Sequence, residues 1–338
     1  MFEKDSVQRL RRLSSLIGNT PLLAIELMVG DEKRTIYAKA ESFNMTGSIK
    51  DRMAYTIMEQ AYIRGTLKEG YCIIEVTSGN TGISFAALGQ ALGHRVTIFM
   101  PDWVSCERRK LLESFGAEII LFSKGEGGFP DYINRAEDLS RSTENSFLPA
   151  QFSNNDNIEA HYTATGPEIW HQLQSRAISL DAFVAGVGTG GTIMGAGRFF
   201  RERNPAVKLH PLQPTGTHLL SMENKEKGHR IEGIADGYFP PILDLNTLNS
   251  LISVDDGDAI LMARKLAAEL GLGVGISSGA NFLGALKVQE RMGSDAVVVT
   301  LFPDDNKKYL STDLFRKEPL QDWFLSPHIT LLEVESFA

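Results

Sequence analysis

One lysine of this chain stands in a setting that could bring it to a reaction. The stretch FNMTGSIKDRMAY, residues 43–55, carries small residues at Thr46, Gly47 and Ser48 and delivers Lys50 to the start of a predicted helix. A lysine amine can act as a nucleophile, as a base, or as the partner of an aldehyde in a Schiff base. The same stretch is compatible with Lys50 being an ordinary surface cation. Whether Lys50 takes part in a reaction must therefore be judged from the other small-residue turns of the chain.

The first of these turns is EVTSGNTGIS, residues 75–84, which joins a predicted strand to a predicted helix. Such a turn points backbone N–H groups and hydroxyls at one place, beside the positive end of the helix dipole, and this arrangement suits an anion. An ordinary, well-capped strand-to-helix turn would use the same residue types. The residues of this turn that could meet a carboxylate or a cofactor are Thr77, Ser78, Gly79, Asn80 and Thr81.

The second turn, AGVGTGGTIMGAG at residues 185–197, is suited to a phosphate. Backbone amides and two hydroxyls can wrap such a group. A dinucleotide site would add an acidic residue after the next strand, where this chain has Gln213, and a Walker A loop would end in G-K-[ST], which is absent. The pattern therefore indicates a phosphate without favouring NAD or ATP. The residues of the predicted cup are Gly188, Thr189, Gly190, Gly191 and Thr192.

A third turn, GVGISSGAN at residues 273–281, places Ser277 and Ser278 between a strand-like piece and a helix. Taken alone, it is equally well explained as a serine cap. Together the chain offers a lysine, a turn for a carboxylate, a turn for a phosphate and a serine-bearing turn. Pyridoxal phosphate would use all four, because it needs a lysine for its aldehyde and a protein partner for its ring nitrogen.

The elements around these turns alternate between strands and helices, which predicts parallel sheets flanked by helices. There are too many units for one small sheet, so we expect two α/β lobes with the ligand in the cleft between them. Ser48 and Asp51 are predicted to form a capping box, and the tail after Leu310 is predicted to lack regular structure. The predicted strands are 35–41, 71–76, 95–101, 118–123, 181–187, 207–213 and 296–303. The predicted helices are 48–65, 83–93, 107–116, 192–203 and 256–271, and 125–130 is predicted to be a surface turn.

Composition narrows the functional classes further. The chain has 338 residues and a net charge of −8, which argues against a general nucleic-acid binder. Cys72 and Cys106 form neither a disulfide framework nor a metal spacing, which favours the cytoplasm. The first 16 residues lack the apolar segment of a signal peptide, and no apolar run reaches the length of a membrane span.

These motifs resemble one family closely. The chain resembles the fold-type-II pyridoxal-phosphate enzymes of the cysteine synthase (O-acetylserine sulfhydrylase) and cystathionine β-synthase group, which share the tryptophan synthase β-like fold. The resemblance runs from IGNTPLL at 17–23 to KYLST at 308–312, and TGSIKDR and HYTATGPEIW are most similar to the cysteine synthase B branch. It implies a larger lobe from 1–46 and 156–315, a smaller mobile lobe at 47–155, and a C-terminal tail at 316–338. It also implies a homodimer.

The resemblance assigns a role to each candidate residue. Lys50 resembles the Schiff-base lysine, and Gly188 to Thr192 resemble the phosphate cup. Asn80 resembles the partner of the cofactor's ring hydroxyl, and Ser277 that of its pyridine nitrogen. The groups that would hold the substrate carboxylate are Thr77, Ser78, Gly79, Thr81 and Gln151.

The implied reaction is a β-replacement that makes L-cysteine from O-acetyl-L-serine and sulfide through an α-aminoacrylate, with Lys50 moving the Cα proton. A serine at position 277, unlike an aspartate, need not keep the ring nitrogen protonated, and an unprotonated ring favours loss of a β-substituent over transamination. The alternatives are a sister activity (cystathionine β-synthase, cysteine desulfhydrase, or a synthase using O-phosphoserine, homocysteine or a carrier-bound thiocarboxylate), a dehydratase or racemase of the same fold, and a non-catalytic binding protein.

The chain departs from the family pattern at a loop that is expected to face the cleft. In IEGIADGYFP, residues 231–240, Asp236 stands where small residues are usual. Our hypothesis is that Asp236 influences the choice of second substrate, and a solvated loop charge is the alternative. Met45 and Asn306 replace a proline and a glycine and are expected to leave their loops intact.

Overall fold

The structure is a computed structural model and describes residues 2–123, 125, 128–217, 228–235 and 237–337. Among these residues, no helix is long and apolar enough to cross a bilayer. Asp236, which the sequence singled out, lies outside the described residues.

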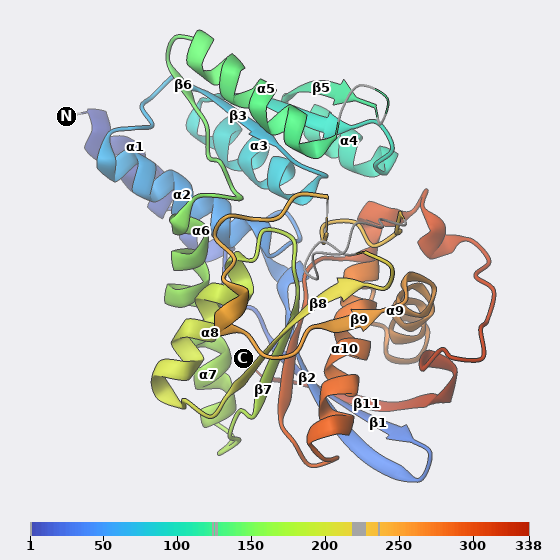
Figure 1. The fold of residues 1–338 in the computed structure, drawn as a ribbon. Helices are drawn as coiled ribbons and strands as arrows, with labels where there is room; N and C mark the ends of the chain where they lie inside the picture. The colour runs from blue at the N-terminus through green and yellow to red at the C-terminus, as the bar shows by residue number, and fades with distance from the viewer. Residues whose placement is uncertain (1, 124, 126–127, 218–227, 236, 338) are drawn as a thin grey trace.

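A mixed seven-stranded sheet forms the larger layer of the molecule (Figure 1). Its strands are β1 (Leu22–Val29), β2 (Glu32–Ala40), β7 (Ala182–Gly186), β8 (Lys208–Pro214), β9 (Ile252–Val254), β10 (Val298–Phe302) and β11 (Ile329–Phe337). Their order is β11-β1-β2-β10-β7-β8-β9. β1 runs antiparallel to β11 and β2, and the remaining pairs are parallel. The carboxyl ends of β10, β7 and β8 therefore meet at one edge, where a ligand site is expected.

The smaller sheet has four parallel strands in the order β5-β4-β3-β6. They are β3 (Cys72–Val76), β4 (Arg95–Pro101), β5 (Glu118–Phe122) and β6 (Ser146–Phe147). All of β3 is buried, since helices cover both faces, which explains why four of its five residues are apolar instead of alternating with polar ones; Glu75 is the exception.

The helices pack against these two sheets. They are α1 (Phe2–Arg11), α2 (Lys50–Arg64), α3 (Asn80–Leu92), α4 (Cys106–Ser114), α5 (Phe129–Ser142), α6 (Asn155–Ala160), α7 (Gly166–Gln174), α8 (Gly191–Arg203), α9 (Asp256–Leu270) and α10 (Ile276–Met292). In Figure 1, α7 and α8 lie on one side of the larger sheet and α9 and α10 on the other.

Successive side chains of β7 pack into the apolar clusters on the two opposite faces of the larger sheet. Ala182 and Val184 join the apolar cluster under α9 and α10, whereas Phe183 and Ala185 join the cluster under α7 and α8. Successive side chains of a strand point to opposite faces, so a strand buried on both sides must be apolar at every position.

The predicted fold class is confirmed: the chain is an α/β protein with two mainly parallel, helix-flanked sheets. The smaller sheet is built from residues within 47–155, as the predicted smaller lobe requires, but a division into lobes that move against each other stays a prediction.

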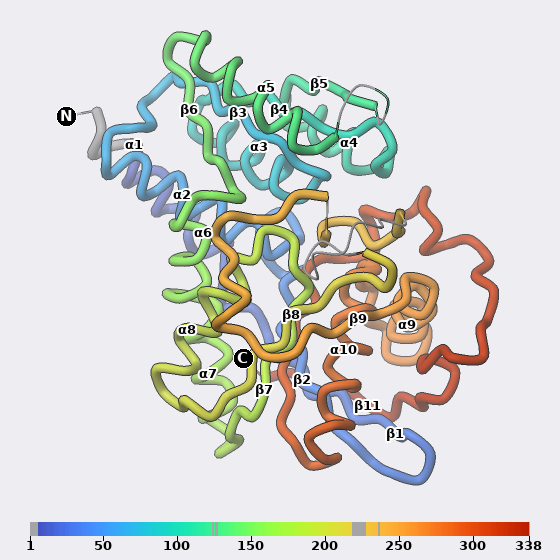
Figure 2. The backbone as a smooth tube through the Cα atoms, in the orientation of Figure 1, coloured from blue at the N-terminus to red at the C-terminus, as the bar shows by residue number. Residues whose placement is uncertain are grey.

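The expected irregular tail is wrong. Residues 329–337 form β11, which pairs with β1 along its length and places the C-terminus beside the larger sheet (Figure 2). The burial pattern of β11 alternates only in its first half, with Ile329 and Leu331 inside, so its sequence carries a weak strand signal.

Candidate active site

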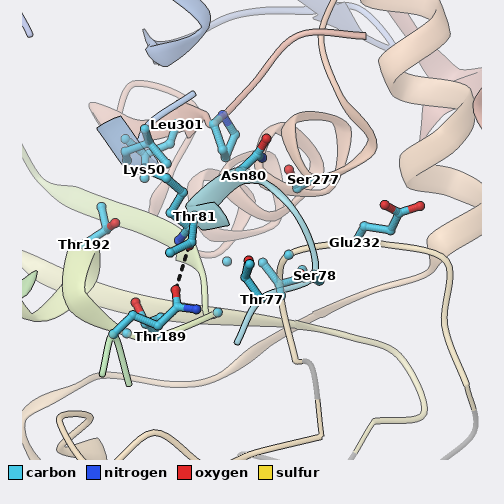
Figure 3. A pocket seen from close by; sticks show the side chains of 18 of the residues that line it. Lys50, Thr77, Ser78, Asn80, Thr81, Thr189, Thr192, Glu232, Ser277 and Leu301 are labelled. Atoms are coloured by element: carbon cyan, nitrogen blue, oxygen red, sulfur yellow. Dashed lines mark hydrogen bonds between the residues drawn. The ribbon is translucent and has the colours of Figure 1, made fainter. Parts of the chain in front are cut away.

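The predicted site residues converge on one cavity, which holds about 810 Å³ of space that is partly open to solvent. In the view of Figure 3, Lys50 lies between Thr192 and the turn that carries Thr77 and Ser78. Lys50 comes from the start of α2, and the other walls come from the ends of β3, β7 and β10 and from the start of α10. The predicted residues that line the cavity are Lys50, Thr77, Ser78, Asn80, Thr81, Gln151, Gly188, Thr189, Gly190, Thr192 and Ser277.

The loop before Lys50 is held by a buried carboxylate. Asp51 accepts hydrogen bonds from the backbone N–H and the hydroxyl of Thr46, both at 2.6 Å, and from the hydroxyl of Ser84 at 2.6 Å. The predicted capping box is wrong: the Ser48 hydroxyl accepts from Lys50 N at 3.3 Å instead of from Asp51 N, and the Asp51 carboxylate turns back to Thr46. Burial raises the pKa of Asp51 despite these three donors. The result is a rigid entry for α2, which fixes where Lys50 begins.

An ion cluster that the sequence did not reveal anchors the same helix. Arg52, two residues after Lys50, forms paired hydrogen bonds with Glu41 and with Glu168 at 2.6 to 2.8 Å. Lys39, which is fully buried, lies 2.9 Å from Glu168. Burial opposes ionisation of Glu168, but Arg52 and Lys39 hold its pKa at about 2. The cluster ties α2 to β2 and α7, and only the fold brings these distant residues together.

The turn after β3, where the carboxylate site is predicted, is held by hydrogen bonds to its own residues and to Gln151. Gly79 N donates to Thr77 Oγ1 at 2.9 Å, and the hydroxyl of Thr81 donates to Gln151 Oε1 at 2.7 Å. Gln151 Nε2 in turn donates to the carbonyl of Val76 at 2.7 Å. Gly79 itself does not line the cavity, but its φ of +151° and the side chain of Arg108, 2.2 Å from where a Cβ would stand, leave room only for glycine.

A buried acid lies behind this turn. Glu75 accepts hydrogen bonds from Val76 N at 2.8 Å and Gln151 N at 3.1 Å. Burial outweighs these donors and raises the pKa of Glu75 to about 7. The protonation state of Glu75 is therefore linked, through the hydrogen bond from Gln151 N, to Gln151, which is a predicted substrate contact.

The turn after β7, where the phosphate cup is predicted, leads into the start of α8. Gly190 adopts a φ of +84°, and a Cβ on Gly188 would lie 2.4 Å from the carbonyl oxygen of Gly233. Asn157 Nδ2 donates to the hydroxyl of Thr189 at 2.9 Å, which orients it. Gly191 is the first residue of α8 and lies just behind the cavity wall. A helix start with crowded glycines and oriented hydroxyls is suited to an anion.

His161 lies behind this cup and has a structural role. Its ring contacts the hydroxyls of Thr165 and Thr192 at 2.9 and 3.2 Å. Burial, with Arg52 and Lys50 nearby, lowers the pKa of His161 well below its usual value, so the ring is neutral.

Ser277 lies in the first turn of α10 and faces the cavity. The expected strand before it is instead an isolated β-bridge between Val274 and Asp305. The position of Ser277 at the cavity wall is nevertheless the one that the prediction requires.

A buried, unsatisfied acceptor tests whether the cavity fits pyridoxal phosphate. Asn80 Nδ2 donates to Asp304 Oδ2 at 2.8 Å, while Asn80 Oδ1 is buried without a hydrogen-bond partner among the described residues. A buried acceptor of this kind needs a donor. A cofactor held by Lys50, the Gly188 cup and Ser277 would bring polar groups to it, so the residues fit the cofactor.

The sequence also matches a protein-family model described as "Pyridoxal-phosphate dependent enzyme" over residues 13–304. The chain belongs to this family. It is accordingly a pyridoxal-phosphate enzyme of the cysteine synthase type. The individual roles assigned to the site residues stay predictions.

Three relatives show the range of activities among proteins similar to this chain. A probable cysteine synthase of Bacillus subtilis is 41% identical over 89% of this chain and 96% of its own. The crystal structure of a hydrogen sulfide-producing enzyme of Fusobacterium nucleatum is 50% identical, covers 98% of this chain and 99% of its own, and has a TM-score of 0.94. An O-acetylserine-dependent cystathionine β-synthase of Helicobacter pylori is 34% identical, covers 90% and 98%, and has a TM-score of 0.81.

Two cavity residues escaped the sequence reading. Arg108 from α4 is buried and pairs with Glu232, which lies in the loop that the sequence singled out for Asp236. Both line the cavity. Isolated charged residues on a helix and a loop form no sequence motif, so the sequence did not indicate that Arg108 and Glu232 line the cavity. Glu232 stands in the same unusual segment as Asp236, IEGIADGYFP, and that segment could have drawn attention to it.

Proposed function

We propose that this chain takes L-cysteine as its amino-acid substrate and replaces the thiol at Cβ, releasing hydrogen sulfide. The observation that carries this proposal is the cavity, which brings together Lys50, the turn at 77–81 and the turn at 188–192. Release of hydrogen sulfide is supported by similarity to the hydrogen sulfide-producing enzyme, which is 50% identical over nearly the whole chain, and L-cysteine is the amino acid that carries the required thiol at Cβ.

The chain's own residues perform three tasks in this reaction. The turn at 77–81 binds the substrate's α-carboxylate with N–H groups and hydroxyls at the start of α3. The amine of Lys50 takes the Cα proton and later returns it. The walls around the cavity keep bulk water from the reacting carbons.

Bound pyridoxal phosphate supplies the electron sink that makes the Cα proton acidic. Gly188 to Thr192 would hold its phosphate, Asn80 would face its ring hydroxyl, and Ser277 its ring nitrogen. The Cβ–S bond of cysteine breaks, and the departing hydrosulfide takes a proton and leaves as hydrogen sulfide. A nucleophile then bonds to Cβ and loses its own proton.

The second candidate is the synthesis of L-cysteine from O-acetyl-L-serine and sulfide, with acetate as the leaving group. It uses the same residues for the same tasks. The observation in its favour is the 41% identity to the probable cysteine synthase over 96% of that protein's length. We further propose that the chain works as a cytoplasmic homodimer on small-molecule substrates. Light scattering of the purified protein would test whether it is a dimer.

Steady-state kinetics on the cofactor-loaded enzyme separate the two reactions. One assay follows sulfide release from L-cysteine, and the other follows L-cysteine formed from O-acetyl-L-serine and sulfide. We expect the larger kcat/KM in the first assay. A larger value in the second supports the second candidate, and no turnover in either, with cofactor bound, contradicts both.

A further inference from the structure

One buried amide nitrogen joins the two turns that are predicted to hold anions. Asn157, in α6, is 1% exposed. Its Nδ2 donates to the backbone carbonyl of Gln151 at 2.8 Å and to the hydroxyl of Thr189 at 2.9 Å. An amide nitrogen carries two protons, so these two partners use both of them. Gln151 borders the turn at 77–81, whereas Thr189 belongs to the turn at 188–192.

The Gln151 end of this bridge reaches the predicted carboxylate site. The side chain of Gln151 donates to the carbonyl of Val76 at 2.7 Å and accepts from the hydroxyl of Thr81 at 2.7 Å, the bond drawn as a dashed line in Figure 3. Its backbone N–H donates to Glu75 at 3.1 Å. The Nε2 group has two protons, and among the described residues Val76 accepts only one of them. The second proton is therefore left for a carboxylate in the cavity, which Gln151 lines.

At the other end, the same amide sets the direction of the Thr189 hydroxyl. The carbonyl oxygen of Gln151 can only accept, so the amide atom beside it is the nitrogen, and Thr189 Oγ1 must accept from that nitrogen. Gly191 N donates to the same oxygen at 3.4 Å. A hydroxyl has one proton and two lone pairs, so the proton points away from both donors. No described residue accepts it, and Thr189 lines the cavity, where an anion would be a strong acceptor.

The position of α6 keeps this amide in place. Asp156, the neighbour of Asn157, accepts two hydrogen bonds from Arg64 of α2, at 2.6 and 2.7 Å. On the other side, a Cβ on Gly191, the first residue of α8, would overlap the Asn157 amide. Such close packing leaves the amide little freedom to turn, so its two hydrogen bonds keep their directions.

From this geometry we infer that Asn157 is a positioning residue that sets both turns at once. It directs the Thr189 proton toward the cofactor's phosphate and holds Gln151 where it meets the substrate's carboxylate. This inference deepens the proposed function and rests on the predicted places of these two groups. Because one side chain serves both turns, its loss weakens the binding of both ligands, whereas loss of the Thr189 hydroxyl weakens the binding of the phosphate alone.

Two binding constants of the full-length protein test this inference in the variant Asn157→Leu, which keeps the approximate shape of the side chain and removes its donors. Titration of the apoprotein with pyridoxal phosphate, followed by absorbance, should give a dissociation constant about tenfold higher than in the parent, the size expected for one hydrogen bond to a charged group. L-Alanine carries the α-carboxylate but no group that can leave from Cβ. Its dissociation constant, measured at saturating cofactor, should rise by about two- to tenfold.

A second substitution separates positioning from general loosening. Thr189→Val should weaken the binding of pyridoxal phosphate as Asn157→Leu does, but should leave that of L-alanine unchanged. The double variant should bind the cofactor no more weakly than the weaker single variant, because Asn157 acts on the phosphate through this hydroxyl. Asn157→Ala replaces Asn157→Leu in the same cycle if the leucine variant does not fold.

Asn154→Leu is the matched control. Asn154 caps the same helix by accepting from Asp156 N at 2.9 Å, and it does not line the cavity. Its substitution loosens α6 without touching either turn, so both dissociation constants should stay at the parent values.

Three results would overturn this inference: unchanged constants in Asn157→Leu, separate losses that multiply in the double variant, or equal losses in Asn154→Leu. Failure of the proposed function looks different. A parent enzyme that binds pyridoxal phosphate and L-alanine but releases no sulfide from L-cysteine contradicts the proposed reaction, while the binding constants still report on Asn157.

Discussion

The guanidinium of Arg52 and the carboxylate of Glu168 form two parallel hydrogen bonds, each 2.7 Å long, across 116 residues of sequence. Arg52 stands two residues after Lys50, and its other edge is bound by the fully buried Glu41. This pairing fixes the start of α2 against the larger sheet. It also predicts how the fold responds when the guanidinium is removed.

Arg52→Met should lower the free energy of unfolding by about 3–5 kcal/mol, because it leaves the buried Glu41 without its cation and removes one of the two cations that pair with Glu168. Urea denaturation measures the change. Arg11→Met is the control, since Arg11 pairs with Glu59 on the surface with 59% of its side chain exposed, and its loss should be far smaller. Equal losses in the two variants would show that the buried cluster does not anchor α2.

Lys50→Ala should abolish covalent attachment of the cofactor and lower turnover by roughly 10²–10⁴-fold, the range for loss of a positioned acid–base group. Borohydride treatment followed by intact-mass analysis reports the attachment. Lys110→Ala, at an exposed lysine of α4, should keep the attached mass. A borohydride-fixed adduct on the Lys50→Ala protein would show that the cofactor is attached to another lysine.

Glu75→Gln should flatten the dependence of stability on pH. The pKa of Glu75 is raised by burial from its ordinary 4.5 to about 7, so between these values the folded protein holds a proton that the unfolded chain releases. The stability linked to this group is fully present below pH 4.5 and is lost as the pH rises through 7, by about 3 kcal/mol in total.

Denaturation curves at pH 5, 6, 7 and 8 for the parent protein and Glu75→Gln measure this effect. The substituted glutamine has one acceptor oxygen fewer, so it loses the hydrogen bond from either Val76 N or Gln151 N, and this lowers stability by a similar amount at each pH. The informative quantity is therefore the difference between the two proteins in the slope of stability against pH. Parallel profiles would mean that Glu75 is ionised across the whole range.

Gly188→Ala should weaken cofactor binding by about 10- to 100-fold. The new Cβ would stand 2.4 Å from Gly233 O, and relieving such overpacking costs about 1–3 kcal/mol. Titration of the apoprotein with pyridoxal phosphate, followed by absorbance, gives the dissociation constant. Gly125→Ala is the control, since its Cβ would meet only the Ser123 hydroxyl at 4.0 Å. An unchanged constant would mean that the loop carrying Gly233 moves aside freely.

Local sequence predicted most elements because their signals are short-range. Ile49, Met53, Ile57 and Ala61 recur every four residues and are all buried, as the predicted helix requires. β11 was missed because it owes its existence to pairing with β1 over 300 residues away. Asp51 was drawn from its predicted helix cap by Thr46, five residues before it, and by Ser84, 33 residues on. Helix α5, which begins at Phe129 within the expected surface turn, was missed although its apolar residues Phe129, Tyr132 and Ala136 recur at helical spacing.

The sequence by itself predicted the chemistry: one lysine on a small-residue loop, one turn that suits a carboxylate, one that suits a phosphate, and a serine-bearing turn to which the family resemblance assigns the ring nitrogen. Those are properties of contiguous residues, which fix their own turn geometry. Only the tertiary structure decided which charges meet around them, such as Arg108 with Glu232 and Arg52 with Glu168. The strength of an electrostatic pair depends on the distance between the two charges in space and on their burial, and the order of residues along the chain specifies neither the distance nor the burial directly.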